Sequence, residues 1–245
     1  MFLEFENIIN ARELGGLSAS GGHVRRGKLL RTAGLGKATK SDVKRLSEEY
    51  AVRHVFDFRD GVEVRREHDA DIPGAEHHCI PVLPVLPGRD STWENTPPEA
   101  VLGMFREMYR TMAENDVCCA AYSRFLKTAA GSGETLLWHC TQGKDRTGIA
   151  AILLLTVLGV SEDDALEDYM LSNRPMAAEF ERLTADMESE REREFYRLMV
   201  FVFPEIVGEY ISCVRRGFGS LERYIRERLG LTSGEIDALR LAYLE

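Results

Sequence analysis

A cysteine and an arginine stand six positions apart in segment 139–148, whose sequence is HCTQGKDRTG. The apolar run 136–138 before it predicts a buried strand, and the apolar run 149–160 after it predicts a helix. A loop that ends at a helix N-terminus presents backbone N–H groups that no intrahelical carbonyl satisfies. With the positive end of the helix dipole, these groups form a site for a tetrahedral anion.

Two side chains of this loop suit phosphate chemistry. The field at the start of a helix favours the thiolate form of a cysteine, so Cys140 is the predicted nucleophile. The planar guanidinium of Arg146 can bind two phosphate oxygens at once. The pattern therefore predicts a cysteine-dependent phosphatase that forms a phosphocysteine. The predicted phosphate-binding residues are Thr141, Gln142, Gly143, Lys144, Asp145, Arg146 and Thr147.

A buried structural cysteine and a nucleotide-binding Walker loop are the competing explanations of this segment. Cysteine is often buried, but the full string, with His139 before the cysteine and Thr147-Gly148 after the arginine, is specific. A Walker loop needs Ser or Thr after Gly-Lys, and a glycine five positions before that glycine. Asp145 and Trp138 hold these positions, so the nucleotide-binding interpretation fails.

The segment resembles the phosphate-binding loop of protein tyrosine phosphatases. Its core GKDRTG is similar to one bacterial and fungal tyrosine phosphatase family, which includes secreted dual-function phosphatases of intracellular pathogens. The resemblance covers nearly the whole chain, through segments 10–16 (NARELGG), 25–33 (RRGKLLRTA), 57–59 (DFR) with Glu63, and 219–244. The departures from the family pattern are Glu13 for Asp, Thr32 for Ser, Phe58 for Leu, and Gln142 where Ala is common. Gln142 alone lies in the loop and could alter the pocket floor.

Hydrolysis of a phosphomonoester also needs a general acid that protonates the departing alcohol. The Trp-Pro-Asp triplet that supplies it in many tyrosine phosphatases is absent. The resemblance implies Asp145, inside the loop, as this acid and thus as a catalytic residue beside Cys140 and Arg146. Alternatively, Asp145 pairs with a nearby base and rigidifies the loop. Asp57 is the second candidate acid, or else it orients Arg146 or Lys144.

His139, Asp57 and Arg59 are predicted supporting residues. We expect His139 to orient the loop from behind through hydrogen bonds; proton transfer is its alternative role, because histidine titrates near neutral pH. Thr147 either donates its hydroxyl to the Cys140 sulfur or caps the helix start.

Lys144 bears on the substrate. A second loop cation suits a substrate with several phosphates, such as a phosphoinositide head group, and lipid phosphatases of the tyrosine phosphatase superfamily use a similar lysine. The alternative is that Lys144 contacts a phosphotyrosyl peptide or solvent. The predicted substrate is therefore a phosphorylated protein, a phosphoinositide or both.

Composition excludes several classes of protein. The 245 residues, 44% of them apolar, are enough for one large α/β domain. The net charge of −9 argues against a nucleic-acid partner. No apolar run is long enough to predict a transmembrane helix. The N-terminus has acidic residues where a signal peptide is basic, so we expect a cytoplasmic protein, with export without a cleaved signal left open.

Five scattered cysteines without a Cys-x-x-Cys pair predict neither a zinc site nor a disulfide framework. No metal or organic cofactor is indicated, and the oligomeric state stays open.

Strand and helix patterns alternate along the chain. Strands are predicted within 22–32, at 53–58 and at 136–139; helices are predicted at 39–50, 98–113, 116–130, 147–158 and from Ser161. This order predicts an α/β fold of the tyrosine phosphatase type in a single domain, 1–245, whose central, mostly parallel sheet is flanked by helices. The reactive loop then follows the carboxyl end of a strand, where such sheets bind ligands. Segment 80–98 has five prolines and predicts an irregular surface loop.

Region 174–209 is a possible helical lid. Its charged run 188–194 precedes the apolar block 195–203, and the resemblance implies that such a helical pair closes over the reactive loop. The alternative is an ordinary core helix.

Two further functional classes compete with the phosphatase. A catalytically silent phosphate-binding module would normally lack the Cys, Arg or Asp of the loop, and all three are present. A rhodanese-like or arsenate-reductase-like enzyme also uses a loop cysteine, but no paired redox cysteine is evident.

Overall fold

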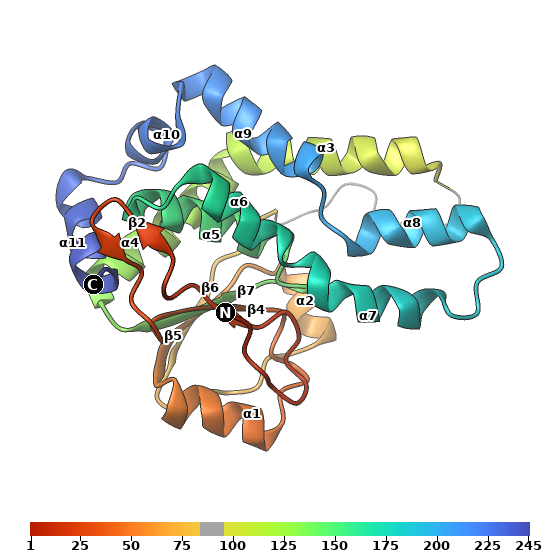
Figure 1. Cartoon of the computed structure of the whole chain (residues 1–245), viewed down its shortest axis with the longest axis horizontal. Helices are drawn as coiled ribbons and strands as arrows, with labels where there is room; N and C mark the ends of the chain where they lie inside the picture. Colours follow the sequence, from red (N-terminus) through yellow and green to blue (C-terminus); the bar gives the residue numbers. More distant parts are fainter. Residues whose placement is uncertain (84–95) are drawn as a thin grey trace.

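The computed structural model describes residues 1–83 and 96–245, and within them five strands form a central sheet in the order β1–β4–β7–β5–β6 (Figure 1). These strands are β1 (Arg12–Glu13), β4 (Leu29–Thr32), β5 (Val52–Asp57), β6 (Glu76–Cys79) and β7 (Thr135–His139). All neighbours are parallel except the edge strand β1, which is antiparallel to β4. The predicted mostly parallel sheet is therefore confirmed.

The central strands bury side chains on both faces of the sheet. Val55 and Leu137 point into one apolar core together with Leu46. Phe56 and Trp138 point into the other core. A strand covered on both faces carries a continuous apolar run, which is why the sequence of β7 is TLLWH, with all five residues buried.

Helices cover both faces. Figure 1 shows α1 on one side of the sheet and α4, α5 and α6 on the other. The helices are α1 (Lys40–Lys44), α2 (Gly61–Arg66), α3 (Pro98–Glu114), α4 (Asp116–Ser132), α5 (Asp145–Leu158), α6 (Glu162–Met170), α7 (Asn173–Thr184), α8 (Glu190–Val200), α9 (Pro204–Phe218), α10 (Leu221–Glu227) and α11 (Ser233–Tyr243).

Helix α5 follows the reactive loop and lies at the centre of the fold. All of its residues from 146 to 158 are buried, because α6, α10 and α11 pack around it. It begins at Asp145, two residues before the predicted start, since the N–H of Gly148 already donates to the carbonyl of Lys144 at 2.8 Å. It ends at Gly159, whose φ of +82° is the left-handed conformation common at helix C-termini.

Helices α7 and α8 lie side by side at one end of the molecule (Figure 1). Helix α8 also packs on α3, where Phe195 and Leu198 form a small apolar cluster with Val101. This cluster is separate from the two cores that flank the sheet. The helical pair is therefore attached to the body of the protein through a limited apolar contact.

Several local predictions can be compared with the structure. Thr39 and Asp42 form the predicted capping box of α1, but the helix changes to a π-helical turn at Arg45–Glu49. Segment 22–32 does contain two strands, but they belong to different sheets: β3 (Gly22–His23) pairs with β2 (Ser18–Ala19), whereas β4 joins the main sheet.

Two further observations concern the described residues alone. The predicted proline-rich loop 80–98 falls largely on residues 84–95, which lie outside them. Among the helices of 1–83 and 96–245, none combines the length and the apolarity that a bilayer crossing requires.

Candidate active site

The segment 140–144 connects the carboxyl end of β7 to the first residue of α5. Its turn depends on Gly143, which has a φ of +67°. A Cβ atom at this position would stand 2.3 Å from the carbonyl oxygen of Thr32 on the neighbouring strand β4. A side chain is excluded by both the backbone conformation and this contact, so the sequence needs glycine here.

Two buried side chains hold the carbonyl groups of the loop. The amide nitrogen Nδ2 of Asn10 donates to the carbonyls of Gln142 and Gly143, at 3.0 Å each. The Arg31 guanidinium donates to the same Gly143 carbonyl at 3.0 Å. The loop N–H groups from Thr141 to Lys144 donate to no backbone acceptor within the described residues. Anchored carbonyls and unpaired amides are the arrangement of an anion-binding nest.

Asp168 on α6 supports both anchors. Its carboxylate binds Arg12 at 2.8 Å and Arg31 at 2.6 Å, and Arg12 in turn donates to the side-chain oxygen of Asn10 at 2.6 Å. Burial alone would raise the pKa of Asp168, but the charges of Arg31 and Arg12 outweigh it and lower that pKa. Burial, together with Arg12, lowers the pKa of Arg31 to about 10. Asn10 and Arg12 of segment 10–16 thus help to hold the reactive loop, a role that was not predicted from the sequence.

Arg146, in the first turn of α5, is bound by Glu63. Its two terminal nitrogens donate to the two carboxylate oxygens of Glu63 at 2.6 and 2.7 Å. Burial alone would raise the pKa of Glu63, but the hydrogen bond and the charge of Arg146 hold it well below its usual range. Glu63 also closes the capping box of α2 with Asp60, and it accepts the hydroxyl hydrogen of Thr141.

The Arg146–Glu63 pair was not predicted. Glu63 was part of the family resemblance, but its distance of 83 positions from Arg146 gave no sign of contact. Sequence analysis had instead offered Asp57 as a partner for Arg146 or Lys144, and both oxygens of Asp57 bind Arg59.

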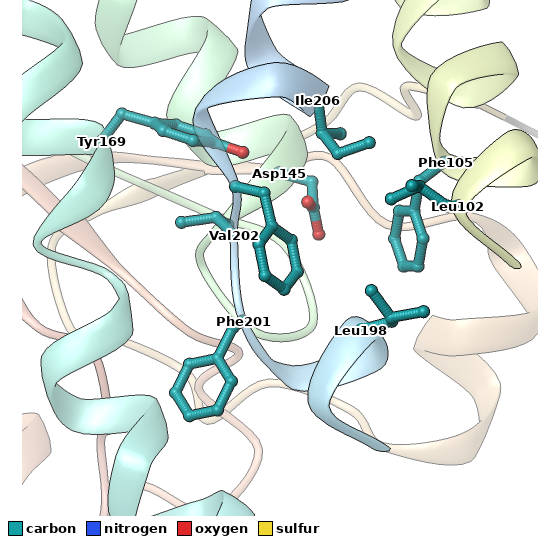
Figure 2. A pocket seen from close by; sticks show the side chains of 9 residues that line it. Leu102, Phe105, Asp145, Tyr169, Leu198, Phe201, Val202 and Ile206 are labelled. Carbon is teal, nitrogen blue, oxygen red and sulfur yellow. The ribbon is translucent and has the colours of Figure 1, made fainter. Parts of the chain in front are cut away.

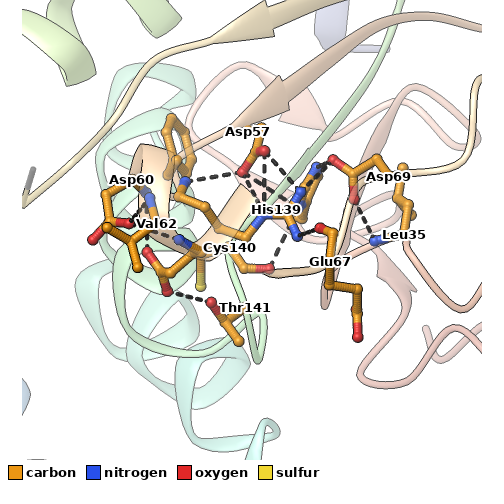
Figure 3. A network of polar contacts seen from close by, with 12 residues as sticks. Leu35, Asp57, Asp60, Val62, Glu67, Asp69, His139, Cys140 and Thr141 are labelled. Atoms are coloured by element: carbon orange, nitrogen blue, oxygen red, sulfur yellow. Dashed lines mark hydrogen bonds and ion pairs between the residues drawn. The ribbon is translucent and has the colours of Figure 1, made fainter. Parts of the chain in front are cut away.

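His139 and Asp57 belong to a buried polar network behind the loop (Figure 3). Arg59 binds Asp57 at 2.9 Å and Asp69 at 2.6 Å. His139 Nε2 lies 3.2 Å from Asp69, and its Nδ1 lies 3.3 Å from the carbonyl oxygen of Cys140. Burial raises the pKa of Asp69, but the hydrogen bond and charge of His139, followed by Arg59, outweigh it and lower that pKa. His139 thus contacts Asp69 and the carbonyl of Cys140 behind the loop, and its orienting role stays a prediction.

Cys140 is the first residue of the loop, directly after His139, and it is 2% exposed. The cationic side chains of Arg146, Lys144 and Arg31 lie close enough for a charge on its sulfur to affect their own ionisation. Reactive cysteines in proteins characteristically have cationic neighbours of this kind.

Thr147 is not the cap of α5. The N-cap position is Lys144, without a side-chain capping bond, so the capping interpretation was wrong. The Thr147 hydroxyl is buried and has no hydrogen-bond partner in the part of the chain that the structure describes.

Asp145 points into an apolar pocket (Figure 2). Figure 2 shows its carboxylate between Tyr169 and Val202 on one side and Phe105 and Leu198 on the other. The Tyr109 hydroxyl donates to Asp145 Oδ1 at 2.6 Å and lies 2.5 Å from the hydroxyl of Tyr169. Burial and the Asp145 charge raise the pKa of Tyr109 well above its ordinary value, so this phenol remains a donor. Sequence analysis missed both tyrosines.

The pocket also has walls from the end of α8 and the segment that follows it, including Phe201 and Phe203. Lys144 connects the loop to this wall: its ammonium donates to the Met199 carbonyl at 2.5 Å and lies 3.5 Å from that of Phe201. The side chain is 2% exposed, and burial lowers the pKa of Lys144. In this structure Lys144 therefore contacts the helical pair rather than the anion-binding face of the loop.

Asp57, Asp69 and His139 could in principle surround a metal ion. However, the buried guanidinium of Arg59 already binds both carboxylates and neutralises one of their two charges, so these groups are partnered without a metal ion.

Comparison with known proteins shows the family of this chain. Residues 3–245 match the model of the tyrosine phosphatase family. A Cupriavidus necator protein named as a tyrosine-protein phosphatase is 34% identical over 98% of this chain and 86% of its own length. The triple specificity protein phosphatase PtpB of Mycobacterium tuberculosis is 23% identical over 89% of this chain and 91% of its own. The crystal structure of P. aeruginosa TpbA covers 82% of this chain and 97% of its own, at 15% identity and a TM-score of 0.32. On the match of the family model and of the Cupriavidus relative, this chain belongs to the tyrosine phosphatase family.

Proposed function

We propose that this protein hydrolyses phosphomonoesters through a phosphocysteine on Cys140. The observation that carries the proposal is the loop geometry: Asn10 and Arg31 anchor the Gly143 carbonyl, and the loop N–H groups that follow Cys140 have no backbone acceptor within the described residues. Preorganised donors of this kind stabilise the charge on the equatorial oxygens of the phosphoryl group in the transition state of its transfer. Glu63 holds the Arg146 guanidinium for the same oxygens.

The reaction then has two displacements. The Cys140 thiolate forms a bond to phosphorus as the bond to the alcohol oxygen breaks, and that oxygen takes a proton from the general acid. Water next attacks the phosphocysteine, gives a proton to the same group, and the sulfur leaves as thiolate.

Asp145 is the general acid in this proposal. Its carboxylate lines the apolar pocket, which takes the leaving group in this proposal; the Tyr109 hydroxyl binds Oδ1, and the Lys144 ammonium lies 3.8 Å from Oδ2. Asp57 is a poor alternative because Arg59 binds both of its oxygens, so protonation would break a buried ion pair.

The pair α7–α8 acts as a lid in this proposal. Its contacts with the body include a small apolar cluster on α3, the Lys144 bond to Met199, and Arg174 over the ring of Phe2. A lid excludes water from the reacting groups and shields a thiolate from oxidation. The alternative, an ordinary core helix, is disfavoured because α8 lies outside both cores that flank the sheet.

The substrate class that fits best is an aryl phosphate, as in phosphotyrosine. The pocket wall beside Asp145 is apolar and includes Phe105, Phe201 and Phe203, which suit an aromatic ring better than an inositol ring rich in hydroxyls. Both curated relatives described above are named as protein phosphatases. Phosphoinositide hydrolysis would need Lys144 to leave the Met199 carbonyl and face the additional phosphates.

The mechanism is tested by stopping the reaction in acid. With a ³²P-labelled phosphotyrosyl peptide, the parent enzyme should retain label in a form that is stable in acid and lost on thiolysis. Cys140→Ser should lose turnover and this label together, whereas Cys213→Ser, on α9, should retain both. Full turnover in the Cys140→Ser variant would refute the mechanism.

A substrate panel tests the specificity. We expect kcat/KM for phosphotyrosyl peptides to exceed that for soluble phosphoinositides by about 10-fold or more, a difference of about 1.4 kcal/mol in transition-state stabilisation. The reverse order would assign the lipid as substrate and refute the aryl proposal.

A further inference from the structure

Two histidines meet at the edge of the sheet, outside the reactive loop. His54 on β5 and His78 on the edge strand β6 are both about nine-tenths buried, and His54 Nδ1 lies 3.0 Å from His78 Nε2. Glu76, the register partner of His54, reaches over both rings: its oxygens lie 3.8 Å from His54 Nδ1 and 3.7 Å from His78 Nδ1. Ligand atoms of the three residues all lie within 4.8 Å of one another.

We propose that His54, His78 and Glu76 bind a divalent transition metal ion, with Zn²⁺ as the principal candidate. Two imidazoles and a carboxylate are a ligand set that zinc accepts, with water in the fourth position. Imidazole nitrogen selects Zn²⁺ and its transition-metal neighbours over Mg²⁺ and Ca²⁺, which prefer oxygen ligands.

The spacing of the nitrogens fits one shared ion. Two nitrogens bound to zinc at about 2.0–2.1 Å in tetrahedral geometry stand about 3.3 Å apart. The observed separation is 3.0 Å, so the rings need to open by about 0.3 Å. The ring of His78 is stacked on Phe56 with centroids 4.6 Å apart, which fixes its plane. The carboxylate of Glu76 is 68% exposed and can rotate onto the ion from the solvent side.

The other nitrogen of His54 has the partner that a metal ligand needs. Histidines that bind metal usually donate their second ring N–H to a carboxylate or a carbonyl, which fixes the tautomer. His54 Nε2 is buried without a hydrogen bond, and the carboxylate of Glu134, just after α4, lies 3.3 Å from it. A small movement of Glu134 completes this bond and leaves the Nδ1 lone pair directed at the ion.

Burial lowers the pKa of His78, which favours the neutral ring that a metal ligand needs. Binding requires the tautomer in which His78 carries its proton on Nδ1, beside Glu76, and leaves the Nε2 lone pair for the ion. The bound ion would fasten the edge strand β6 to β5.

The test is a Zn²⁺ titration of the untagged full chain against a chromophoric chelator, followed by Co²⁺ absorption spectra. Cys140→Ser is the background, because a thiolate would also bind zinc. We expect one equivalent of Zn²⁺, and a Co²⁺ spectrum without thiolate charge transfer. His54→Ala and His78→Ala should each lower the affinity by about 100-fold or more, and Glu134→Ala by about 10–100-fold.

His77→Ala is the matched control. His77 lies between Glu76 and His78 on β6 and is exposed. Its Nε2 lies 3.9 Å from Asp71, and it does not belong to the proposed ligand set. This variant should bind zinc like the parent. Glu76→Gln is the variant to use if the buried histidine variants fail to fold, because Glu76 is exposed and its replacement leaves the core unchanged. This variant should weaken zinc binding by about 10-fold or more. Absence of zinc binding, or binding that survives both Glu76→Gln and His54→Ala, would overturn the proposal.

Discussion

The carboxylate of Glu63 binds the Arg146 guanidinium through both oxygens, at 2.6 and 2.7 Å, and so joins the start of α2 to the first turn of α5. A buried arginine without a counter-charge is costly, and a phosphate dianion is bound for only part of a catalytic cycle. Glu63 supplies the counter-charge throughout. The same carboxylate accepts from the Asp60 N–H, so the plane of the guanidinium is set by the capping box of a separate helix.

Replacing Glu63 by glutamine should therefore affect both stability and rate. The variant keeps the shape but loses the charge, and we expect a loss of about 1.5–3 kcal/mol in the free energy of unfolding, the value of a hydrogen bond to a charged group. A misplaced guanidinium should lower kcat by about 100-fold. Urea unfolding and p-nitrophenyl phosphate turnover measure the two effects.

Glu67→Gln, at the other end of α2, is the control for this experiment and should leave the rate near that of the parent. An unchanged rate in Glu63→Gln would mean that phosphate alone orients Arg146.

Asp168→Asn should destabilise the protein and change its response to acid. Removing one member of a buried ionic cluster costs about 3–5 kcal/mol, because Arg12 and Arg31 would remain buried without a counter-charge. Since the folded protein lowers the pKa of Asp168, this carboxylate stabilises the fold above its unfolded pKa of about 4, and the stabilisation is lost as the pH falls further. The free energy of unfolding should thus fall less steeply below about pH 5 in the variant than in the parent. Parallel pH profiles would contradict this assignment.

Gly143→Ala should abolish activity, and Gly133→Ala provides a close control. Both glycines have nearly the same positive φ, +67° and +65°. A Cβ at Gly133 would meet only the Ala242 side chain at an ordinary 3.6 Å, whereas at Gly143 it would meet the Thr32 carbonyl at 2.3 Å. Both variants should lose about 1–2 kcal/mol of stability from the left-handed conformation. Only Gly143→Ala should also lose phosphate binding, measured by tungstate inhibition or calorimetry.

The sequence was sufficient for the parts of the site that are local in the chain. The strand, loop and helix around Cys140 follow from two apolar runs and the string between them, and the structure has β7 and α5 there. The burial of β7 on both faces explains why the parallel sheet could be predicted: a continuous apolar run of strand length requires cover on both sides.

The sequence was insufficient wherever a partner comes from a distant segment. Glu63 and Asp168 contact the loop or its anchors across 83 and 137 positions, and even for Glu63, which belongs to the family pattern, the sequence did not show which residue it binds. Tyr109 was similarly hidden, because an isolated tyrosine on an amphipathic helix is usually a core residue. Side-chain pairing in these cases is decided by tertiary packing.

Lys144→Met should loosen the helical pair. The ammonium bond to Met199 is one of few polar contacts between the loop and α8, and losing a charged hydrogen bond of this kind costs about 1.5–3 kcal/mol. Hydrogen exchange of the α8 amides should therefore become about 10-fold faster or more, while the α5 amides remain protected. Lys127→Met, on α4, should change neither segment. Equal exchange in α8 before and after Lys144→Met would show that the apolar cluster on α3 holds the pair alone.

Asp145→Asn should reveal the general acid through its dependence on the leaving group. Proton donation contributes about 10²–10⁴-fold when the leaving oxygen is a poor leaving group, and little when it is a nitrophenolate. We therefore expect kcat for phenyl phosphate to fall by about 100-fold or more, kcat for p-nitrophenyl phosphate to fall far less, and the basic limb of the pH–rate profile to vanish. Tyr109→Phe, which removes only the bond to Oδ1, should show a milder form of the same pattern. Asp57→Asn should lower kcat for all substrates alike, because Asp57 acts on the loop through Arg59 and His139. If Asp145→Asn instead lowered kcat equally for both substrates, and Asp57→Asn lowered it mainly for phenyl phosphate, Asp57 would be the general acid and Asp145 a supporting residue.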